Sequence, residues 1–302
     1  MDKGGLYRIV MSLKVEGIVK KFKDIKVLDN IDLTIEKGNV FGLVGVNGAG
    51  KSTLLRSIAG IYKLDEGHIY FDGKDTFNEP SIRKDIFLVG DDLYFPFAST
   101  INALKDFYSS FYDFNEEYYH KYLEVFHLDA NKPISNFSKG MKRQTALVFA
   151  LAIRPKLLLL DEAFDGLDPF VRYTFKKILT ELLEDNESTV IISSHNLKEL
   201  ENICDSYGIL ENGKIDNYGD LMSNKANINK YQIAFNDEKI KDDFTSFDLL
   251  HYSQLGKVIT LVIKGNQDEV VEKLEAMHPL ILDVLSVTFE ELFIYEIERN
   301  RD

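Results

Sequence analysis

The chain has 302 residues, of which 45% are hydrophobic and 28% charged, a composition typical of a globular protein with one large domain or a large and a small one. Its net charge of −13 argues against a broad nucleic-acid surface, because such surfaces are basic. No apolar run approaches the roughly 18 residues that span a bilayer, and the single cysteine, Cys204, excludes a disulfide framework and has the apolar spacing of a core residue.

The amino-terminal segment shows no apolar centre or cleavage pattern of a secretory signal. Patterned sequence begins near Met11, which is an alternative start, so we expect residues 1–12 to be an extension. We expect a soluble, cytoplasmic protein unless a partner carries it elsewhere.

The first patterned residues, 13–39, alternate like antiparallel strands with a turn at Lys37-Gly38. A short apolar strand follows, then a glycine-rich loop and a helix that ends at Gly60. The next strands are expected at 68–73, 85–90, 156–162 and 189–195. The last three are continuous apolar runs, which indicates a parallel sheet covered on both faces.

Helical spacing dominates residues 99–153, where the aromatic side chains between Phe107 and Phe126 are expected to be mostly core. The main domain, residues 13–221, should end after a hairpin whose Asn212-Gly213 suits a type I′ turn. Residues 222–230 are polar and typical of a linker. Residues 231–302 are predicted to form a small α+β domain of two strands, a helix, a strand and a final helix opened by a capping box from Thr288 to Glu291.

The glycine-rich loop, GVNGAGKST at 45–53, matches G-x-x-x-x-G-K-[ST] between a strand and a helix, the context that distinguishes a phosphate-binding loop from a chance match. Backbone N–H groups of such a loop wrap phosphates at a helix N-terminus. Lys51 then reaches the β- and γ-phosphates, the Ser52 hydroxyl binds Mg²⁺, and Thr53 contacts the α-phosphate. The other predicted nucleotide-binding positions of the loop are Gly45, Asn47, Gly48, Ala49 and Gly50.

A second motif lies at the end of the apolar strand at 156–162, in the sequence LLLLDEAFDGLDP. Asp161 at the end of this strand delivers a carboxylate to the metal beside a phosphate loop. Glu162 comes next and is placed to accept a proton from an attacking water. Together the two motifs predict a nucleotide hydrolase.

The motifs, in this order and at this spacing, resemble those of ABC-type ATPases, the nucleotide-binding subunits of transporters. FSKGM (137–141) lies where that family has Leu-Ser-Gly-Gly-Gln, GLDP (166–169) matches the loop after the acidic strand, and His195 matches the switch histidine. The resemblance covers roughly residues 13–220. It implies an α/β fold: a P-loop NTPase domain with a parallel sheet core, an antiparallel β subdomain and a helical subdomain, here followed by the small α+β domain. It also implies ATP and Mg²⁺ as ligands.

Further roles carry over by position. Phe22 falls where the family stacks an aromatic ring on adenine, although a half-buried strand residue is the alternative. His195 is expected to hydrogen-bond the γ-phosphate and to hold Glu162 and the water in place. Ser138 and the Gly140 backbone would serve the ATP of a second, head-to-tail ATPase subunit, with Asp168 at that dimer interface.

The chain departs from the family at two places. The usual metal-binding glutamine is replaced, with Asp91 as the corresponding residue and Asp92 as the alternative; Asp91 would bind the metal through a water or change the coupling to the permease. In FSKGM (137–141), which corresponds to the family's signature motif, Lys139 replaces the first glycine and Met141 replaces the glutamine. The motifs needed for an active site are all present in one chain. Both a homodimer and a heterodimer with a sibling subunit are therefore possible assemblies.

The resemblance therefore predicts the ATP-hydrolysing subunit of an ABC transporter, more similar to bacterial exporters than to importers. A separate membrane permease would hold it at the cytoplasmic face, docking near residues 94–97 and the helical subdomain. No nucleic-acid partner is expected. The alternatives are a soluble ABC ATPase that acts on ribosomes, DNA or cofactor assembly, and a regulatory module that uses ATP only as a switch.

Overall fold

The computed structural model describes residues 11–96, 99–186, 188–200, 203–220, 228–288, 290–291 and 294–295. It divides into two compact units, residues 1–218 and 219–302. Most of the expected extension and linker lies outside the described residues, but residues 228–230, expected in the linker, already belong to a strand of the second unit. Each unit has its own core.

An antiparallel sheet of four strands, in the order β2-β1-β4-β5, forms one side of the first unit. Its strands are β1 (Met11–Phe22), β2 (Ile25–Glu36), β4 (Glu66–Phe71) and β5 (Lys74–Asp75). The pair β1 and β2 is joined by the short turn at Lys23-Asp24. The turn expected at Lys37-Gly38 is present, but it leads from β2 into the other sheet of this unit.

The central sheet has six strands in the order β10-β9-β3-β8-β7-β6. They are β3 (Val40–Val44), β6 (Ile86–Val89), β7 (Leu157–Asp161), β8 (Thr189–Ser194), β9 (Ser206–Glu211) and β10 (Lys214–Asp220). The pairs from β9 to β6 are parallel. Every residue of β3, β7 and β8 is buried, because both faces of the sheet are covered. The hairpin from β9 to β10 turns at Asn212 and Gly213 with φ of 49° and 77°, as a type I′ turn requires.

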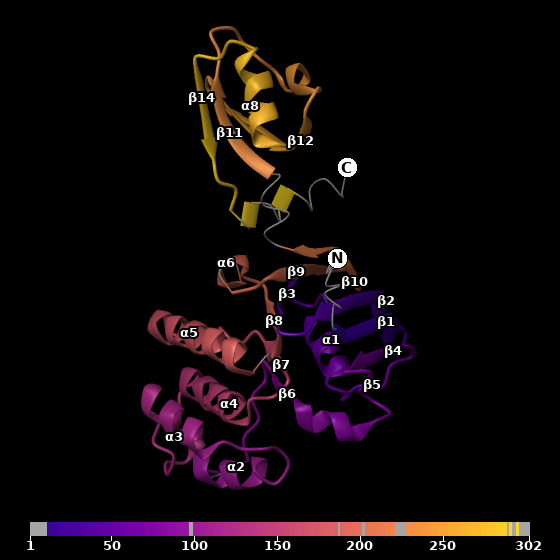
Figure 1. Ribbon diagram of the computed structural model, residues 1–302, viewed down its shortest axis with the longest axis vertical. Coiled ribbons are helices and arrows are strands. Elements are labelled where there is room, and N and C mark those ends of the chain that lie inside the picture. The colour runs from indigo at the N-terminus through magenta and orange to yellow at the C-terminus, as the bar shows by residue number, and fades with distance from the viewer. Residues whose placement is uncertain are drawn as a thin grey trace, which may run out of the picture. The chain divides into compact units, whose positions relative to one another are not determined.

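Helix α1 (Lys51–Ile58) lies between the two sheets, where Leu54, Leu55 and Ile58 join one hydrophobic core with residues of both. Figure 1 shows the helices α2 to α5 on the other side of the central sheet. The remaining helical segments of the unit are η1 (Pro80–Asp85), α2 (Ile101–Tyr108), α3 (Glu116–Val125), η2 (Ile134–Asn136), α4 (Lys139–Ile153), α5 (Pro169–Asn186) and α6 (Leu197–Leu200).

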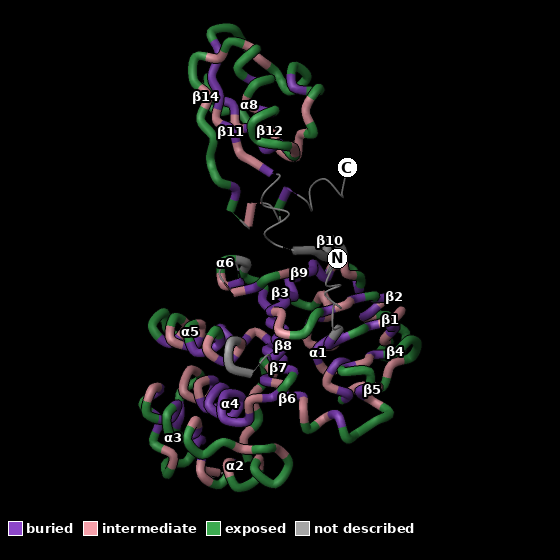
Figure 2. Tube along the Cα trace, viewed as in Figure 1, coloured by how far each residue is buried: buried purple, intermediate pink, exposed green. Residues whose placement is uncertain are grey.

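Helix α4 is the buried centre of the helical subdomain, as Figure 2 shows. Tyr119, Tyr122 and Phe126 pack in this subdomain as expected of core residues. Phe107 and Phe111 do not, since 57% and 61% of their surfaces are exposed, and the expectation of core was wrong for these two. In the part of the chain that the structure describes, no helix has the length and apolar character needed to cross a membrane.

The second unit is a four-stranded antiparallel sheet, ordered β12-β13-β11-β14, with helix α8 packed on it. Its elements are β11 (Ile228–Ala234), η3 (Lys241–Phe244), β12 (Asp248–Leu255), β13 (Val258–Lys264), α8 (Gln267–Glu275) and β14 (Ile281–Leu285). Three strands precede α8 where two were expected, because the turn η3 divides the segment. The expected capping box is confirmed: Glu291 Oε2 accepts from the Thr288 N–H at 3.0 Å, and Thr288 Oγ1 accepts from the Glu291 N–H at 3.2 Å.

Candidate functional site

The loop from β3 to α1 has a backbone that only glycine permits at several positions. A methyl group on Gly45 would lie 2.6 Å from the Leu210 carbonyl oxygen of β9. Gly48 and Gly50 have φ of 84° and 107°, in the left-handed region that favours glycine. The glycines are therefore required by the path of the loop, which passes close to a neighbouring strand before α1 begins.

The amides at the start of α1 form an anion-binding terminus. The first bond back along the helix is from the Leu54 N–H to the Gly50 oxygen, at 2.9 Å. The N–H groups of Lys51, Ser52 and Thr53 come before it, at the positive end of the helix dipole. Such a terminus binds phosphate without further side chains. Asn47 lies on the exposed outer turn of the loop and Ala49 is half-buried.

Lys51 is buried at the centre of this loop. Its Nζ donates to the carbonyl oxygens of Gly45 at 2.6 Å and Val46 at 3.3 Å. It also lies 3.1 Å from Glu162 Oε1 as an ion pair. The loop thus presents its lysine charge toward the end of β7, where the predicted acidic station is located.

Asp161 and Glu162 are both positioned by Ser193 on the neighbouring strand β8. Ser193 lies opposite Asp161 in the parallel register, and its hydroxyl donates to Asp161 Oδ1 at 2.7 Å. The Glu162 N–H donates to the Ser193 hydroxyl at 3.1 Å and to its carbonyl oxygen at 3.2 Å. Sequence reasoning missed this serine, although its place two residues before His195 in an apolar strand was a signal.

Glu162 lies between Lys51 and His195. Its Oε2 is 2.9 Å from His195 Nδ1, and its buried Oε1 faces Lys51 without hydrogen-bond geometry. An ionised carboxylate only accepts, so Nδ1 must carry the proton. His195 can then donate to a phosphate through Nε2 only as the imidazolium. The structure thus brings three predicted site residues, Lys51, Glu162 and His195, into one connected chain of contacts.

Phe22 ends β1, and 41% of its surface is exposed. Tyr62 meets it edge-on, with ring centroids 5.4 Å apart. Lys20 Nζ lies 5.1 Å from the centroid of the Phe22 ring. Tyr62, which the sequence pattern did not single out, therefore supports the ring proposed to stack on adenine.

The signature turn, residues 137–141, lies at the start of α4. The Ser138 hydroxyl caps this helix by accepting from the Met141 N–H at 3.2 Å. Added to Gly140, a methyl group would lie 3.0 Å from the Gly166 oxygen, so the turn packs closely on the loop after β7. Among the described residues, no hydrogen bond or ion pair joins Ser138 or Gly140 to the loop at 45–53.

Asp168 begins the next helix. Its Oδ1 accepts from the N–H groups of Phe170 and Val171, both at 3.0 Å, which is the bonding pattern of an N-cap for α5.

Asp91 follows β6 and is engaged by Arg143 of α4. Arg143 Nη2 lies 2.9 Å from Asp91 Oδ1. One carboxylate oxygen is therefore occupied by an arginine rather than turned freely toward the loop at 45–53. Asp92, the alternative position, is exposed.

Comparison with known proteins decides the family. Residues 28–165 match the sequence profile of the family described as "ABC transporter". The chain is 31% identical over 290 residues to the ABC transporter ATP-binding protein YtrB of Bacillus subtilis, covering 96% of this chain and 99% of the relative. The chain belongs to the ABC transporter ATP-binding protein family. As a member of it, the protein is an ABC-type ATP hydrolase.

Other relatives agree on the family but differ in what they transport. The lantibiotic transport ATP-binding protein SrtF of Streptococcus pyogenes is 31% identical over 205 residues, covering 67% of this chain and 88% of its own. ATP-binding proteins named for import match as well. A solved structure described as the ATP-binding subunit of an ABC transporter superposes with a TM-score of 0.66 at 27% identity, covering 71% of this chain and 92% of that one. The predicted ABC-type fold is confirmed.

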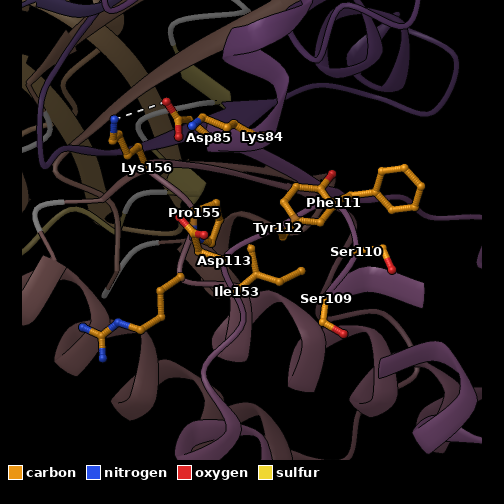
Figure 3. Close-up of a pocket in the computed structure, with 11 residues that line it drawn as sticks. Lys84, Asp85, Ser109, Ser110, Phe111, Tyr112, Asp113, Ile153, Pro155 and Lys156 are labelled. Carbon is orange, nitrogen blue, oxygen red and sulfur yellow. Dashed lines mark hydrogen bonds and ion pairs between the residues drawn. The ribbon is translucent and has the colours of Figure 1, made fainter. Parts of the chain in front are cut away.

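A groove in the ATPase unit lies at the opposite end of the central sheet from the phosphate loop. Its volume is about 350 Å³. Figure 3 shows Lys84 and Asp85 before β6 and Pro155 and Lys156 before β7, with Asp85 and Lys156 paired at 3.2 Å. Because the strands are parallel, these residues mark their amino-terminal ends, whereas Asp91 and Asp161 mark the carboxyl ends. The groove is therefore separate from the nucleotide site.

Cys204 is buried against Gly42, and burial raises the pKa of its thiol well above the ordinary range. It is a core residue, as predicted.

Proposed function

We propose that this ATPase drives a transporter through a separate membrane permease, attached to it at the cytoplasmic face of the cell membrane. The observation that carries the proposal is Glu162, held between Lys51 and His195 at the mouth of a phosphate loop. An ATPase of this family with that arrangement can couple nucleotide binding to movement of a partner.

ATP is the substrate. The loop amides from Gly45 to Gly50, including those of Asn47, Gly48 and Ala49, would wrap its phosphates. Lys51 would neutralise the β- and γ-phosphates, and Thr53 would contact the α-phosphate. Phe22, supported by Tyr62, would stack on the adenine ring. The close approach of Gly45 to β9 and the free helix terminus support this fit.

Mg²⁺ would be held by the Ser52 hydroxyl and the Asp161 carboxylate, while α1 packs against β7 and brings the two elements together. Magnesium in nucleotide sites is generally bound by one or two carboxylates with substrate phosphates and waters. When bound, it neutralises charge that develops on the phosphates. In the described part of the chain, no group of three or more His, Cys, Asp or Glu side chains is placed to hold a metal. Asp91, at the position of the family's usual glutamine, would bind the metal through a water or change the coupling to the permease, and its ion pair with Arg143 favours the second role.

Glu162 would act as the general base. It accepts a proton from the attacking water as the water oxygen bonds to the γ-phosphorus and the bond to the β-phosphate oxygen breaks, which leaves ADP and phosphate. His195 would orient Glu162 and donate to the γ-phosphate. Ser193 holds the backbone of Glu162, and the contacts of the carboxylate with Lys51 and His195 orient the base.

The complete site needs two chains. Ser138 and Gly140 have no bonded route to their own phosphate loop in the described structure, which supports a role at the ATP of a head-to-tail partner. The first amides of α4 and its dipole would meet that γ-phosphate. Asp168 would lie at the same interface. Because one chain carries every station, a homodimer is the simplest assembly, and a heterodimer with a sibling subunit would use the same contacts.

The permease would dock beside the helical subdomain. Tyr94 is 88% exposed, Pro96 is exposed and Phe95 is half-buried, while Phe97 lies outside the described residues. We propose export as the direction, supported by the exporter-like FSKGM signature and by the name of the lantibiotic relative. The ATPase cycle would close the dimer on ATP and reopen it after product release.

A partner capture tests this function. The tagged chain would be purified from membranes solubilised in mild detergent, and the co-purifying proteins would be identified. A polytopic membrane protein in near-equal amount is the expected result, and flux of candidate cargo in inside-out vesicles would then decide the direction. Recovery with ribosomes or assembly proteins in the soluble fraction would favour the non-membrane alternative. Turnover near zero with the partner present would favour the regulatory one.

A further inference from the structure

The first turns of α4 carry two cations on one face of the helix. Lys139 and Arg143 are four residues apart and therefore neighbours on the helix surface. Lys139 Nζ pairs with Asp165 Oδ2 at 2.7 Å, and Arg143 Nη2 pairs with Asp91 Oδ1 at 2.9 Å. The two acids belong to the loops that follow β7 and β6, which are adjacent parallel strands. One helix face thus contacts the carboxyl ends of two neighbouring strands.

Arg143 makes the stronger of these contacts. Its side chain is only 1% exposed, although it carries a full charge. Nη1 donates to the Gly90 carbonyl oxygen at 2.6 Å, and Nη2 donates to the Asp91 carbonyl oxygen at 3.1 Å as well as to the carboxylate. Its Nε is buried with no hydrogen-bond partner among the described residues. The planar guanidinium is therefore fixed from one side, by the loop after β6.

The contact made by Lys139 is weaker. Both partners are largely exposed, at 68% and 48%, and pairs of this kind contribute little in water. The hydrogen bond from Lys139 still lowers the pKa of the Asp165 carboxyl, and the nearby Arg143 charge acts in the same direction. The four charged side chains thus form one cluster of alternating sign, in which Arg143 is buried and the pair of Lys139 and Asp165 is exposed.

We propose that Arg143 is a positioning residue, which fixes the signature turn on the catalytic end of the sheet through Asp91 and Gly90, with Lys139 and Asp165 as a weaker second contact. Arg143 lies little more than one helical turn after Ser138, and a helix transmits such a restraint along its length. Loss of the hydrogen bonds from the Arg143 guanidinium to Gly90 and Asp91 would let the start of α4 shift. Ser138 would then be displaced from the partner's γ-phosphate. The inference rests on the proposed function, because it concerns the ATP of a second chain.

This role also accounts for the acid at position 91. A side chain held by a buried arginine is poorly placed to leave for a metal ion, since its departure would strand the arginine charge. Asp91 therefore acts mainly by neutralising Arg143, and the alternative of changed coupling is the one that the contacts favour.

The test compares Arg143→Lys and Asp91→Asn with Lys105→Met in the full chain. Lys cannot reproduce the guanidinium fork, and Asn keeps the shape of Asp without its charge. The control removes a surface pair of the same subdomain, because Lys105 Nζ bonds Glu116 Oε1 at 2.9 Å between α2 and α3. Hydrogen exchange is measured over residues 136–147, together with the ATP dissociation constant, kcat and KM. A thermal unfolding curve verifies that each variant is folded.

Arg143→Lys should exchange about tenfold faster over residues 136–147 and lose roughly 10- to 100-fold in kcat, with ATP affinity within about threefold of the wild type. Asp91→Asn should show a smaller change in the exchange rate and in kcat, since two hydrogen bonds from Arg143 to backbone oxygens remain. Lys105→Met should leave both unchanged.

Unchanged exchange in Arg143→Lys would overturn the inference, whatever the activity. So would a fall in kcat that merely follows a fall in ATP affinity. Absence of turnover in the wild type with its captured partner would instead refute the proposed function, while the exchange result would still decide whether Arg143 positions the turn.

Discussion

At the residue scale, Glu162 combines a strained backbone with a dense set of contacts. Its φ of 49° lies in the left-handed region, which costs an L-residue about 1–2 kcal/mol. Two bonds from its N–H to Ser193 hold it there, and its carboxylate faces Lys51 and His195. Strain of this kind persists where the surroundings determine one conformation, and it is concentrated at functional sites.

Glu162→Gln should bind ATP with near wild-type affinity but lose hydrolysis by about 100-fold or more, because an amide cannot accept the proton of the attacking water. The variant should also accumulate as an ATP-bound dimer. Steady-state turnover, equilibrium nucleotide binding and light scattering measure the three quantities. Normal turnover would remove Glu162 from the role of base.

Ser193→Ala should weaken the use of Mg²⁺. The hydroxyl that orients Asp161 would be lost, and such supporting groups commonly change metal affinity or activity by about 10- to 100-fold. We expect the Mg²⁺ concentration for half-maximal turnover to rise about tenfold. Ser188→Ala is the matched control. Ser188 is also buried, but it precedes the amino-terminal end of β8 and its hydroxyl donates to the Pro155 carbonyl oxygen. Equal shifts in the two variants would contradict the assignment.

At the scale of elements, the phosphate loop depends on how closely β3 and β9 approach. Gly45 passes the Leu210 oxygen with no space for a side chain, and Gly50 is surrounded by Val27 and Leu28 of β2. The loop therefore takes its path from both sheets, and Lys51 at the start of α1 lies 3.1 Å from Glu162, the residue after β7.

Gly45→Ala should displace this loop. An added methyl group 2.6 Å from a backbone oxygen forces a shift that we expect to cost about 1–3 kcal/mol in the free energy of unfolding. ATP affinity should fall at least about tenfold, since the amides must all face one phosphate chain. Gly38→Ala provides the control: its φ of 77° is strained but its surroundings are open, so unfolding free energy should fall while ATP affinity does not. Denaturant titration and nucleotide binding measure both effects, and wild-type ATP affinity in Gly45→Ala would refute the requirement.

At the scale of the whole molecule, the proposed ATP site has two parts, the phosphate loop and the signature turn, which the described residues of one chain do not join. Its phosphate loop and its signature turn belong to different elements, and the described structure has no bond between them. A head-to-tail dimer of a C2 kind would bring each half against the other half of its partner.

Mixing two inactive variants tests this arrangement. Lys51→Ala disables the phosphate loop and Ser138→Ala disables the signature turn, so each alone should hydrolyse ATP poorly. In mixed dimers one of the two composite sites is intact, and an equal mixture should recover up to about a quarter of wild-type turnover. No recovery after subunit exchange, verified by differently tagged chains, would argue that the turn acts within its own chain.

The proposed site residues that lie close together in the sequence could be predicted from it, because the chemistry of nucleotide binding requires a fixed pattern. A phosphate loop needs Gly45, Gly50 and Lys51 in order between a strand and a helix, and a buried apolar strand that ends in Asp161-Glu162 points to one edge of a parallel sheet. The alternation of apolar and polar residues in β1 and β2 also predicted strands, because side chains that repeat with a period of two lie on one face and can pack against one core.

Only the tertiary structure decided which distant groups meet. Ser193 supports Asp161 because β7 and β8 pair in one register, and Arg143 reaches Asp91 because α4 packs on β6. Phe107 and Phe111 continue the helical spacing of their buried neighbours, yet both are exposed, and Phe111 lies in the turn after α2, which ends at Tyr108. Periodicity states that a residue belongs to a face, whereas burial and ion pairing depend on what the fold places against that face.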